Sequence, residues 1–229
     1  MKAYRLEIQT EGIVRGAARE IGRLVETGSY ISNTSLYYAL GISTSRYADT
    51  LGKPTYTEDT EDEKNIYVAP AQPVNETMYT NLLTTVSGNK YAERNLSAQD
   101  PDNEIADKNF PKVGTEKVMT SGNKFETFLI AENGVELPKY FRLGKKRGKR
   151  SLEIEEVEIE EKSGDFTTSH PIGAYDTKLT PKGDLLTRKI RPAPLILQAR
   201  YEGEYYELNY GESERTVLPG DLEFLKQKR

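Results

Sequence analysis

Residues 138–162 constrain the fold of this chain more than any other segment, because their charge reverses halfway. Seven lysines and arginines lie within residues 139–150, and glutamates alternate with apolar residues after that point. Alternation with a period of two predicts a β-strand with a solvated glutamate face. Leu152 and Ile154 share one parity, whereas Val157 and Ile159 share the other. This change of phase predicts a bulge or bend in one long strand, or a break between two strands.

The remaining periodicities predict an α+β fold. Residues 4–9 alternate between apolar and polar, and residues 66–70, 78–86 and 124–131 also contain runs typical of strands. Residues 194–201 and 204–211 predict a terminal pair of strands around Glu202 and Gly203. Helical spacing of apolar residues over 15–28 and 33–41 predicts two helices that end at glycines. This order fits a ferredoxin-like antiparallel sheet with its helices on one face.

The domain organisation follows from the same pattern. We expect residues 1–162 to form a ferredoxin-like domain with long insertions at about residues 49–65, which are acidic, and 87–124, which are polar. A loop as long as the second insertion is uncommon inside a domain and is usually functional or disordered. Residues 163–229 are expected to add extra C-terminal strands, as a β-rich extension packed on that domain.

The composition excludes several classes of protein. The chain has no cysteine, which excludes disulfides and thiolate zinc sites, and its single histidine, His170, excludes paired-histidine metal centres. Carboxylates alone could still hold a hard cation, but no metal or other cofactor is expected. No run approaches the roughly 18 apolar residues of a membrane helix, and the N-terminus has no apolar signal core. We expect a cytoplasmic protein without a membrane partner. Because the net charge is −4, any contact with nucleic acid must be local.

The basic half of residues 138–162 has the chemistry of a phosphate-binding loop. Glycine lets backbone amides approach a polyanion, and lysines and arginines pair with phosphates. Tyr140 and Phe141 lie beside the loop and are candidates for stacking on a base. The other predicted RNA-binding residues of this segment are Arg142, Gly144, Lys145, Lys146, Arg147, Gly148, Lys149 and Arg150. The alternative is a solvated turn whose cations are balanced by the glutamates that follow.

Three further features are weaker candidates. Arg15, Arg19 and Arg23 would form one stripe on the first predicted helix and could bind phosphates, or could be a solvated face. The start of the second predicted helix, at Asn33, Thr34 and Ser35, could offer amide and hydroxyl groups to an anion, although ordinary capping is the simpler interpretation. His170 has no recognisable nucleophile motif near it, so we expect no catalytic role.

The chain resembles the Cas-five subunit of type I-D CRISPR interference (Cascade) complexes, the Csc-one family of the RAMP superfamily. The resemblance lies in three ordered segments, "AREIGRLVETGSYISNTSLYYALG", "IYVAPA" and "LPKYFRLGKKRGKRSLEI". It implies a fold like that of RNA-recognition domains, with a glycine-rich loop before the last core strand that contacts guide RNA. Residues 144–148 lie in that place, although they contain only two glycines. The resemblance also implies an inserted thumb over the guide, which either insertion could supply.

The resemblance implies a non-catalytic subunit that caps the 5′ handle of CRISPR RNA in an antiviral ribonucleoprotein complex. Its expected partners are the handle, the backbone subunit (Csc-two, Cas-seven-like) and the large subunit (Cas-ten-d), with target DNA as a further candidate contact. Two alternatives stay open. One is a metal-independent endoribonuclease of the same fold that processes repeat RNA, with His170 or a tyrosine as its base. The other is a protein-interaction module whose basic loop docks on an acidic partner.

Overall fold

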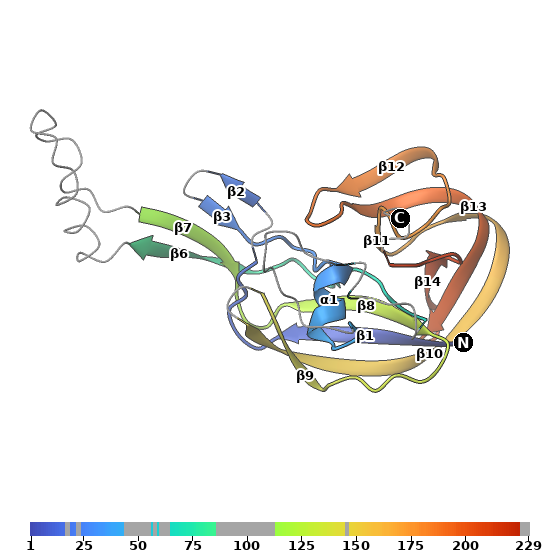
Figure 1. Cartoon of the computed structure of the whole chain (residues 1–229), viewed down its shortest axis with the longest axis horizontal. Coiled ribbons are helices and arrows are strands. Elements are labelled where there is room, and N and C mark those ends of the chain that lie inside the picture. Colours follow the sequence, from blue (N-terminus) through green and yellow to red (C-terminus); the bar gives the residue numbers. More distant parts are fainter. Residues whose placement is uncertain are drawn as a thin grey trace, which may run out of the picture.

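The computed structural model describes residues 1–16, 19–21, 24–43, 56, 59, 65–85, 113–144 and 147–224 (Figure 1). Within these residues the chain forms one α-helix, α1 (Asn33–Ala39), and is otherwise built from strands. The strands are β1 (Lys2–Thr10), β2 (Arg19–Ile21), β3 (Leu24–Glu26), β4 (Ile66–Val68), β5 (Gln72–Pro73), β6 (Tyr79–Thr85), β7 (Val113–Met119), β8 (Lys124–Ala131), β9 (Tyr140–Leu143), β10 (Gly148–Thr167), β11 (Ile172–Gly173), β12 (Lys182–Arg188), β13 (Leu195–Tyr210) and β14 (Glu214–Pro219). The antiparallel sheet is as predicted, but the described part is richer in strands than an α+β fold with several packed helices.

The main sheet is organised around β1. Its strands follow the order β11-β13-β10-β1-β8-β4, and every neighbouring pair in this order is antiparallel. The alternating apolar residues of β1 explain its central place, because Leu6 and Ile8 are fully buried against the neighbouring strands and α1. The strands predicted at residues 4–9, 66–70 and 124–131 are therefore confirmed as β1, β4 and β8.

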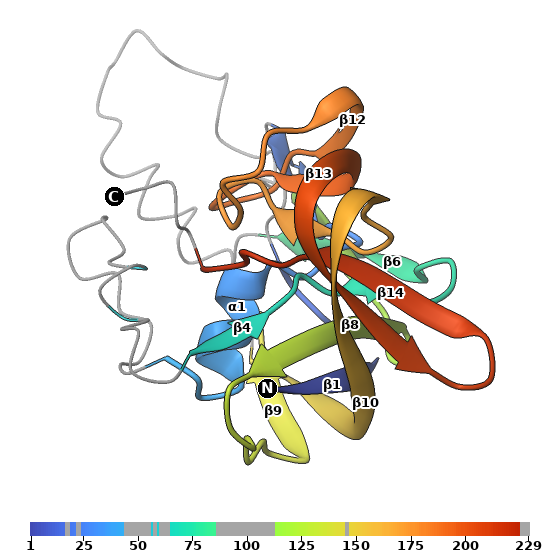
Figure 2. The ribbon, with the colours of Figure 1, turned by 90° about the vertical axis from the view of Figure 1, so that its right-hand side faces the viewer.

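The sheet carries a separate hydrophobic cluster on each face. Tyr4, Leu6 and Ile8 point to the first cluster, which packs under α1. Ala3, one residue out of phase, points to the second cluster, which is formed largely by the C-terminal strands. Figure 2 shows α1 and the β13–β14 region at different sides of the sheet. Opposite faces of one sheet are thus buried by different parts of the chain.

This arrangement explains the change of phase in β10. Leu152 belongs to the first cluster and Val157 to the second. The face of β10 that is buried therefore changes between these two residues. The pairing with β1 runs without a register shift to Val157, and the pairing with β13 begins at Glu158. One long, bending strand, which was one of the predicted possibilities, is confirmed (Figure 1). The expected domain boundary after residue 162 lies inside this unbroken strand.

The long strands β10 and β13 curve together where two glycines meet. Gly164 and Gly203 are directly paired, with φ angles of 145° and 151°, a region that side chains with a Cβ rarely adopt. The pair of strands expected around Glu202 and Gly203 is wrong, because residues 195–210 form one continuous strand in which both of these residues pair with β10.

The helix predicted over residues 15–28 is wrong. Its described parts form β2 and β3, which join β7 and β6 in a second sheet of order β2-β3-β7-β6. Three glycines at positions 16, 22 and 28 weaken a helix, and pairing of β3 with the distant β7 overrides the local apolar spacing. In Figure 1 the β6–β7 hairpin extends away from the main sheet.

The two predicted insertions are described only in part. Most of the first insertion lies outside the described residues, and so does the second insertion up to residue 112. The end of the second insertion forms β7 and the turn into β8. No helix in the described part is long and apolar enough to span a membrane.

Candidate nucleic-acid interface

The predicted basic loop is the turn of a short hairpin between β9 and β10. Leu143 pairs with Gly148, and the turn closes with a 2.9 Å hydrogen bond from the Arg147 amide to the Gly144 carbonyl. The Arg142 guanidinium donates to the Arg147 carbonyl at 3.0 Å, which ties the strand to the turn. Lys145 and Lys146 lie outside the described residues. The hairpin thus places Arg142, Arg147 and Lys149 on an ordered support.

The two glycines of the turn allow close packing of the backbone against residues 13–15. A Cβ at Gly144 would lie 2.5 Å from the Arg15 carbonyl oxygen, and one at Gly148 would lie 2.8 Å from the Ile13 carbonyl oxygen. Gly144 also has a φ of +84°. We expected these glycines to let amides approach a polyanion. In the structure, their small size instead lets the turn pack on the chain that follows β1.

The exposed cations of the hairpin have no carboxylate partner among the described residues. Arg142 and Lys149 are directly opposed in the β9–β10 ladder, although like charges in such a pair repel. The glutamates that follow do not neutralise the hairpin. Their ion pairs in the described part join Glu155 to Arg5, Glu156 to Lys2 and Glu160 to Lys162. The interpretation of a turn balanced by its own glutamates is therefore not supported by the ion pairs.

Arg150 does not belong to the exposed surface, so its predicted contact with RNA is contradicted. Its side chain is 0% exposed, and Nη1 donates to the Lys149 carbonyl at 2.8 Å. Nε and Nη2 have no hydrogen-bond partner in the described part of the chain. Burial away from water lowers the pKa of this guanidinium to about 10. Arg150 faces the protein interior because it shares the parity of Leu152 on β10.

The two predicted stacking residues have opposite environments. Phe141 is 5% exposed and packs in the first hydrophobic cluster, so it cannot stack on a base, and this part of the prediction is wrong. Tyr140 is 57% exposed, with the Lys149 ammonium 4.0 Å from its ring centroid. An exposed tyrosine beside a cation can still offer a ring to a base.

The start of α1 is held by structural contacts. Ser32 is the cap, since its side chain accepts a hydrogen bond from the Ser35 amide at 3.3 Å, which corrects the expected cap at residues 33–35. Asn33 and Thr34 are buried, and the side-chain Nδ2 of Asn33 donates a hydrogen bond to Asp176 Oδ2 at 2.7 Å. Asn33 and Thr34 therefore cannot contact RNA, whereas the half-buried Ser35 still borders the surface.

The predicted arginine stripe does not exist as a helical face. Arg15 lies before β2 and its Nε is 3.2 Å from a carboxylate oxygen of Glu116. Arg19 lies on β2, where its backbone is paired with Glu26. Arg23 lies outside the described residues. The spacing of four residues between Arg15 and Arg19 therefore does not place them on one helical face.

A cleft joins several of the predicted elements. It has a volume of about 190 Å³ and lies between the start of α1, the end of β9 and the residues that follow β12. Its lining includes Ser32 and Ser35 on one side, Leu143 and Gly144 on another, and Arg191 from the C-terminal extension. The structure therefore brings the helix start and the glycine turn together, although two of the three helix residues predicted to bind RNA are buried elsewhere.

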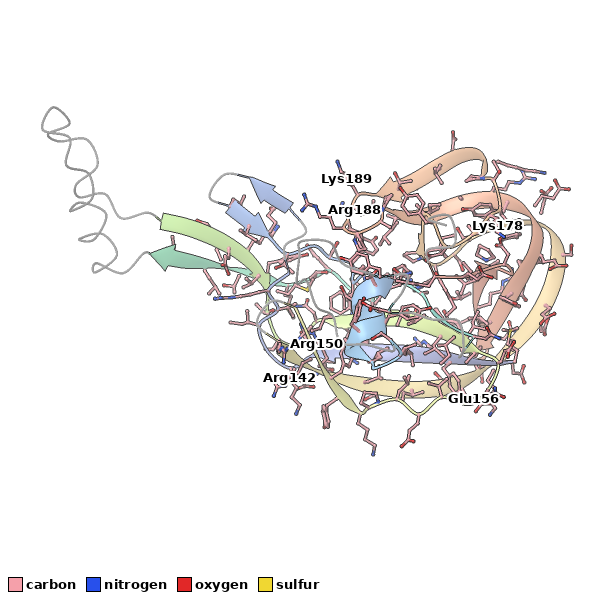
Figure 3. The ribbon with its side chains drawn as sticks, in the orientation of Figure 1. Arg142, Arg150, Glu156, Lys178, Arg188 and Lys189 are labelled. Carbon is pink, nitrogen blue, oxygen red and sulfur yellow. The ribbon has the colours of Figure 1, made fainter. Side chains whose placement is uncertain are left out.

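Sequence reasoning missed a second group of cations. Arg188, Lys189 and Arg191 are exposed and have no ion pair with any described residue. In the view of Figure 3, Arg188 and Lys189 lie at one end of β12, and Arg142 lies on the other side of α1. The signal was available in the sequence as the short run "TRKIRP" at residues 187–192. The pairing of β12 with β13 is what places this run beside the cleft.

The candidate catalytic histidine is unfavourably placed. His170 is 0% exposed, lies edge-on to Phe128 with ring centroids 5.0 Å apart, and its Nε2 is 2.8 Å from the Pro70 carbonyl oxygen. Burial lowers the pKa of this imidazole to about 4, so it is neutral near pH 7. The described residues contain no group of three histidine or acidic side chains that could hold a metal ion.

The chain was compared with protein families, curated proteins and solved structures. A family model described as Type I-D CRISPR-associated protein Cas5/Csc1 matches residues 1–227. No curated protein matches the chain in sequence. A solved structure described as a CRISPR protein from Archaeoglobus fulgidus is 12% identical, with a TM-score of 0.48 over 95% of this chain and 99% of that one. A chain of the Type III-B Cmr-beta complex bound to cognate target RNA and AMPPnP is 8% identical, with a TM-score of 0.46 over 86% of each chain.

Proposed function

Because the chain belongs to the Type I-D CRISPR-associated Cas5/Csc1 family, we propose that it is a non-catalytic subunit that binds guide RNA in a multi-subunit CRISPR complex. Its ligand in this proposal is the 5′ handle of the CRISPR RNA, which it caps. Its protein neighbours are a backbone subunit and a large subunit. Glu153 and Glu158 are exposed on β10 beyond the basic hairpin and make no ion pair with a described residue, so they are available to such protein partners.

The observation that carries this proposal is the set of exposed cations without carboxylate partners in the described part of the chain. Arg142, Arg147 and Lys149 on the β9–β10 hairpin belong to this set, and Arg188, Lys189 and Arg191 belong to it near β12. A protein with net charge −4 has enough carboxylates to neutralise these groups. Because no described carboxylate neutralises these cations, they can bind a polyphosphate chain, and such binding releases counterions.

The topology supports a ferredoxin-like assignment for the core. The order β10-β1-β8-β4, with α1 between β1 and β4, is that of a split β-α-β arrangement. The second crossover, between β8 and β10, contains β9 in place of a helix. The basic hairpin therefore precedes the last core strand. The projecting β6–β7 ribbon, which brackets residues 86–112, favours the second insertion over the first as the thumb.

A non-catalytic role is supported by the position of His170. The endoribonuclease alternative needs a base within hydrogen-bond reach of the RNA. The imidazole is instead buried between Phe128 and the carbonyl of Pro70. Purified protein incubated with repeat RNA without metal should leave the RNA intact. Cleavage that is lost in His170→Ala would support the enzyme and contradict this proposal.

The proposal is tested by reversing the charge of the hairpin. The triple variant Arg142→Glu, Arg147→Glu and Lys149→Glu should lose affinity for single-stranded repeat RNA and should not enter the assembled complex. Circular dichroism of the variant checks that the fold is retained. A triple variant that binds guide RNA as tightly as the wild type would refute the assigned surface.

A titration of RNA affinity against salt concentration separates RNA binding from docking on an acidic protein. Affinity for single-stranded RNA should fall with a slope of about −0.7 per phosphate contact on a logarithmic plot against salt. A protein that binds no RNA at any salt concentration, but enters the complex only when its hairpin is intact, would favour the protein-interaction alternative.

A further inference from the structure

We propose that the cleft beside Gly144 takes one unstacked base of a single-stranded RNA, with the Tyr30 ring against the base and Arg191 at the adjoining phosphate. This inference rests on the proposed function, because it requires an RNA strand to lie on the surface that bears the exposed cations. It adds a base-binding site from residues outside the predicted basic loop.

The size of the cleft fits one ring system. Its volume is about 190 Å³. An engineered protein cavity of about 150 Å³ is enough to bind benzene. The cleft is therefore large enough for a single planar base.

The lining has the mixed chemistry of a base site. Apolar side chains from separate segments form part of its walls, among them Val14, Met119 and Leu143. The hydroxyl groups of Ser32 and Ser35 lie 2.9 Å apart at one side and can exchange hydrogen bonds with polar edges. Small-molecule sites usually combine apolar walls with a few polar groups that fix orientation.

Two side chains of the lining are free to bind a ligand. Tyr30 is half-buried and makes no side-chain hydrogen bond or ring contact in the described part of the chain. Arg191 is exposed and has no carboxylate partner among the same residues. An aromatic ring supplies stacking, and a guanidinium supplies a planar fork for phosphate oxygens. Together they match the two parts of a nucleotide.

The surroundings of the cleft favour a nucleic acid as its occupant. Gly144, which lines the cleft, lies in the same turn as Arg147, and Arg188 and Lys189 directly precede the lining residues 190 and 191. A strand that crosses from one basic group to the other would pass over the opening. The charge on both sides is complementary to the phosphates that flank an inserted base.

The test is a scan of abasic substitutions in repeat RNA, with affinity for the full-length protein measured by fluorescence anisotropy. One position should lose affinity by about tenfold when its base is removed, since stacking on an aromatic side chain has this magnitude. Tyr30→Leu should lose affinity for the natural RNA to a similar extent. The same variant should show no further loss with RNA that is abasic at the sensitive position.

A second variant fills the cleft. Ser35→Phe should reproduce the tenfold loss on natural RNA, whereas the matched Ser163→Phe, at an exposed position on β10, should bind normally. A scan that shows no sensitive position, while RNA binding stays dependent on salt and on Arg142, would overturn the base site alone. A Tyr30→Leu variant that loses affinity equally for natural and abasic RNA would overturn it as well. Absence of any RNA binding would overturn the proposed function together with it.

Discussion

Arg142 and Lys149 lie directly opposite each other in the β9–β10 ladder, and neither has a carboxylate partner among the described residues. Two like charges at opposed positions repel, and an anion shared between them would relieve this repulsion. Each makes a local contact that keeps it in place, Arg142 with the Arg147 carbonyl and Lys149 with the Tyr140 ring.

Neutralising either residue should weaken RNA binding in a way that depends on salt. Arg142→Gln and Lys149→Gln should each lower the affinity for repeat RNA severalfold and reduce the slope against salt by about 0.7. Lys178→Gln is a matched control, because Lys178 is also exposed and lies far from the hairpin in Figure 3. Titrations at several salt concentrations measure both quantities. If all three variants lost the same affinity, the hairpin cations would contribute only through the general charge of the protein and not through a defined binding site.

Two neighbouring aromatic residues should respond in opposite ways to truncation. Phe141→Ala should lower the free energy of unfolding by about 3 to 5 kcal/mol, because it leaves a cavity in the first hydrophobic cluster. Tyr140→Ala should change stability little and weaken RNA binding, because the ring is mostly exposed. Urea denaturation and RNA titration of both variants test this contrast. A Tyr140→Ala variant with unchanged affinity would remove Tyr140 from the interface.

His170 should make the protein less stable in acid. The unfolded chain binds a proton near pH 6.5, whereas the buried imidazole binds one only near pH 4, so stability falls as the pH drops between these values. At pH 4.5 the loss from this residue is about 2 to 3 kcal/mol. His170→Gln should remove it, and the difference between variant and wild type separates it from carboxylate titration. Parallel pH profiles of the two proteins would contradict the assignment.

Gly144→Ala should destabilise the protein more than Gly41→Ala. Both glycines have a positive φ, +84° and +74°, so both variants carry a backbone penalty of about 1 to 2 kcal/mol. Only at Gly144 would the new Cβ also meet a backbone carbonyl, at 2.5 Å, whereas the space around Gly41 is open. Thermal unfolding compares the two. If the losses were the same, the close approach to Arg15 would not constrain the turn.

The strands of the main sheet could be predicted because their signal is local. The alternation in β1 and the buried run of β8 directly reflect the packing of each strand. Residues 15–28 gave a helical pattern instead, because the partner that makes β3 a strand is β7, about 90 residues away. No local pattern contains that pairing, and three glycines were the only sign against a helix.

The charge of the site could be predicted from the sequence, but not which of its side chains are buried. Arg150 and Lys149 look alike in a count of cations, yet Arg150 has the parity of the buried Leu152 and Lys149 has the opposite parity. The position of Phe141 opposite Arg150 depends on the hairpin register, which fixes both as inward-facing residues. Tyr30 and Arg191 were beyond sequence reasoning, because only the folded chain brings them to one cleft.

The continuous strand β10 also sets the distance between the basic hairpin and the C-terminal strands. Inserting or deleting one residue between Leu152 and Val157 would turn every later side chain of the strand to the opposite side, and glutamates would replace apolar residues in the second cluster. A change of length should therefore be tolerated in the turns but not inside this strand. Under the proposed function, RNA on the hairpin and protein subunits on the C-terminal strands would be held at one distance by this strand.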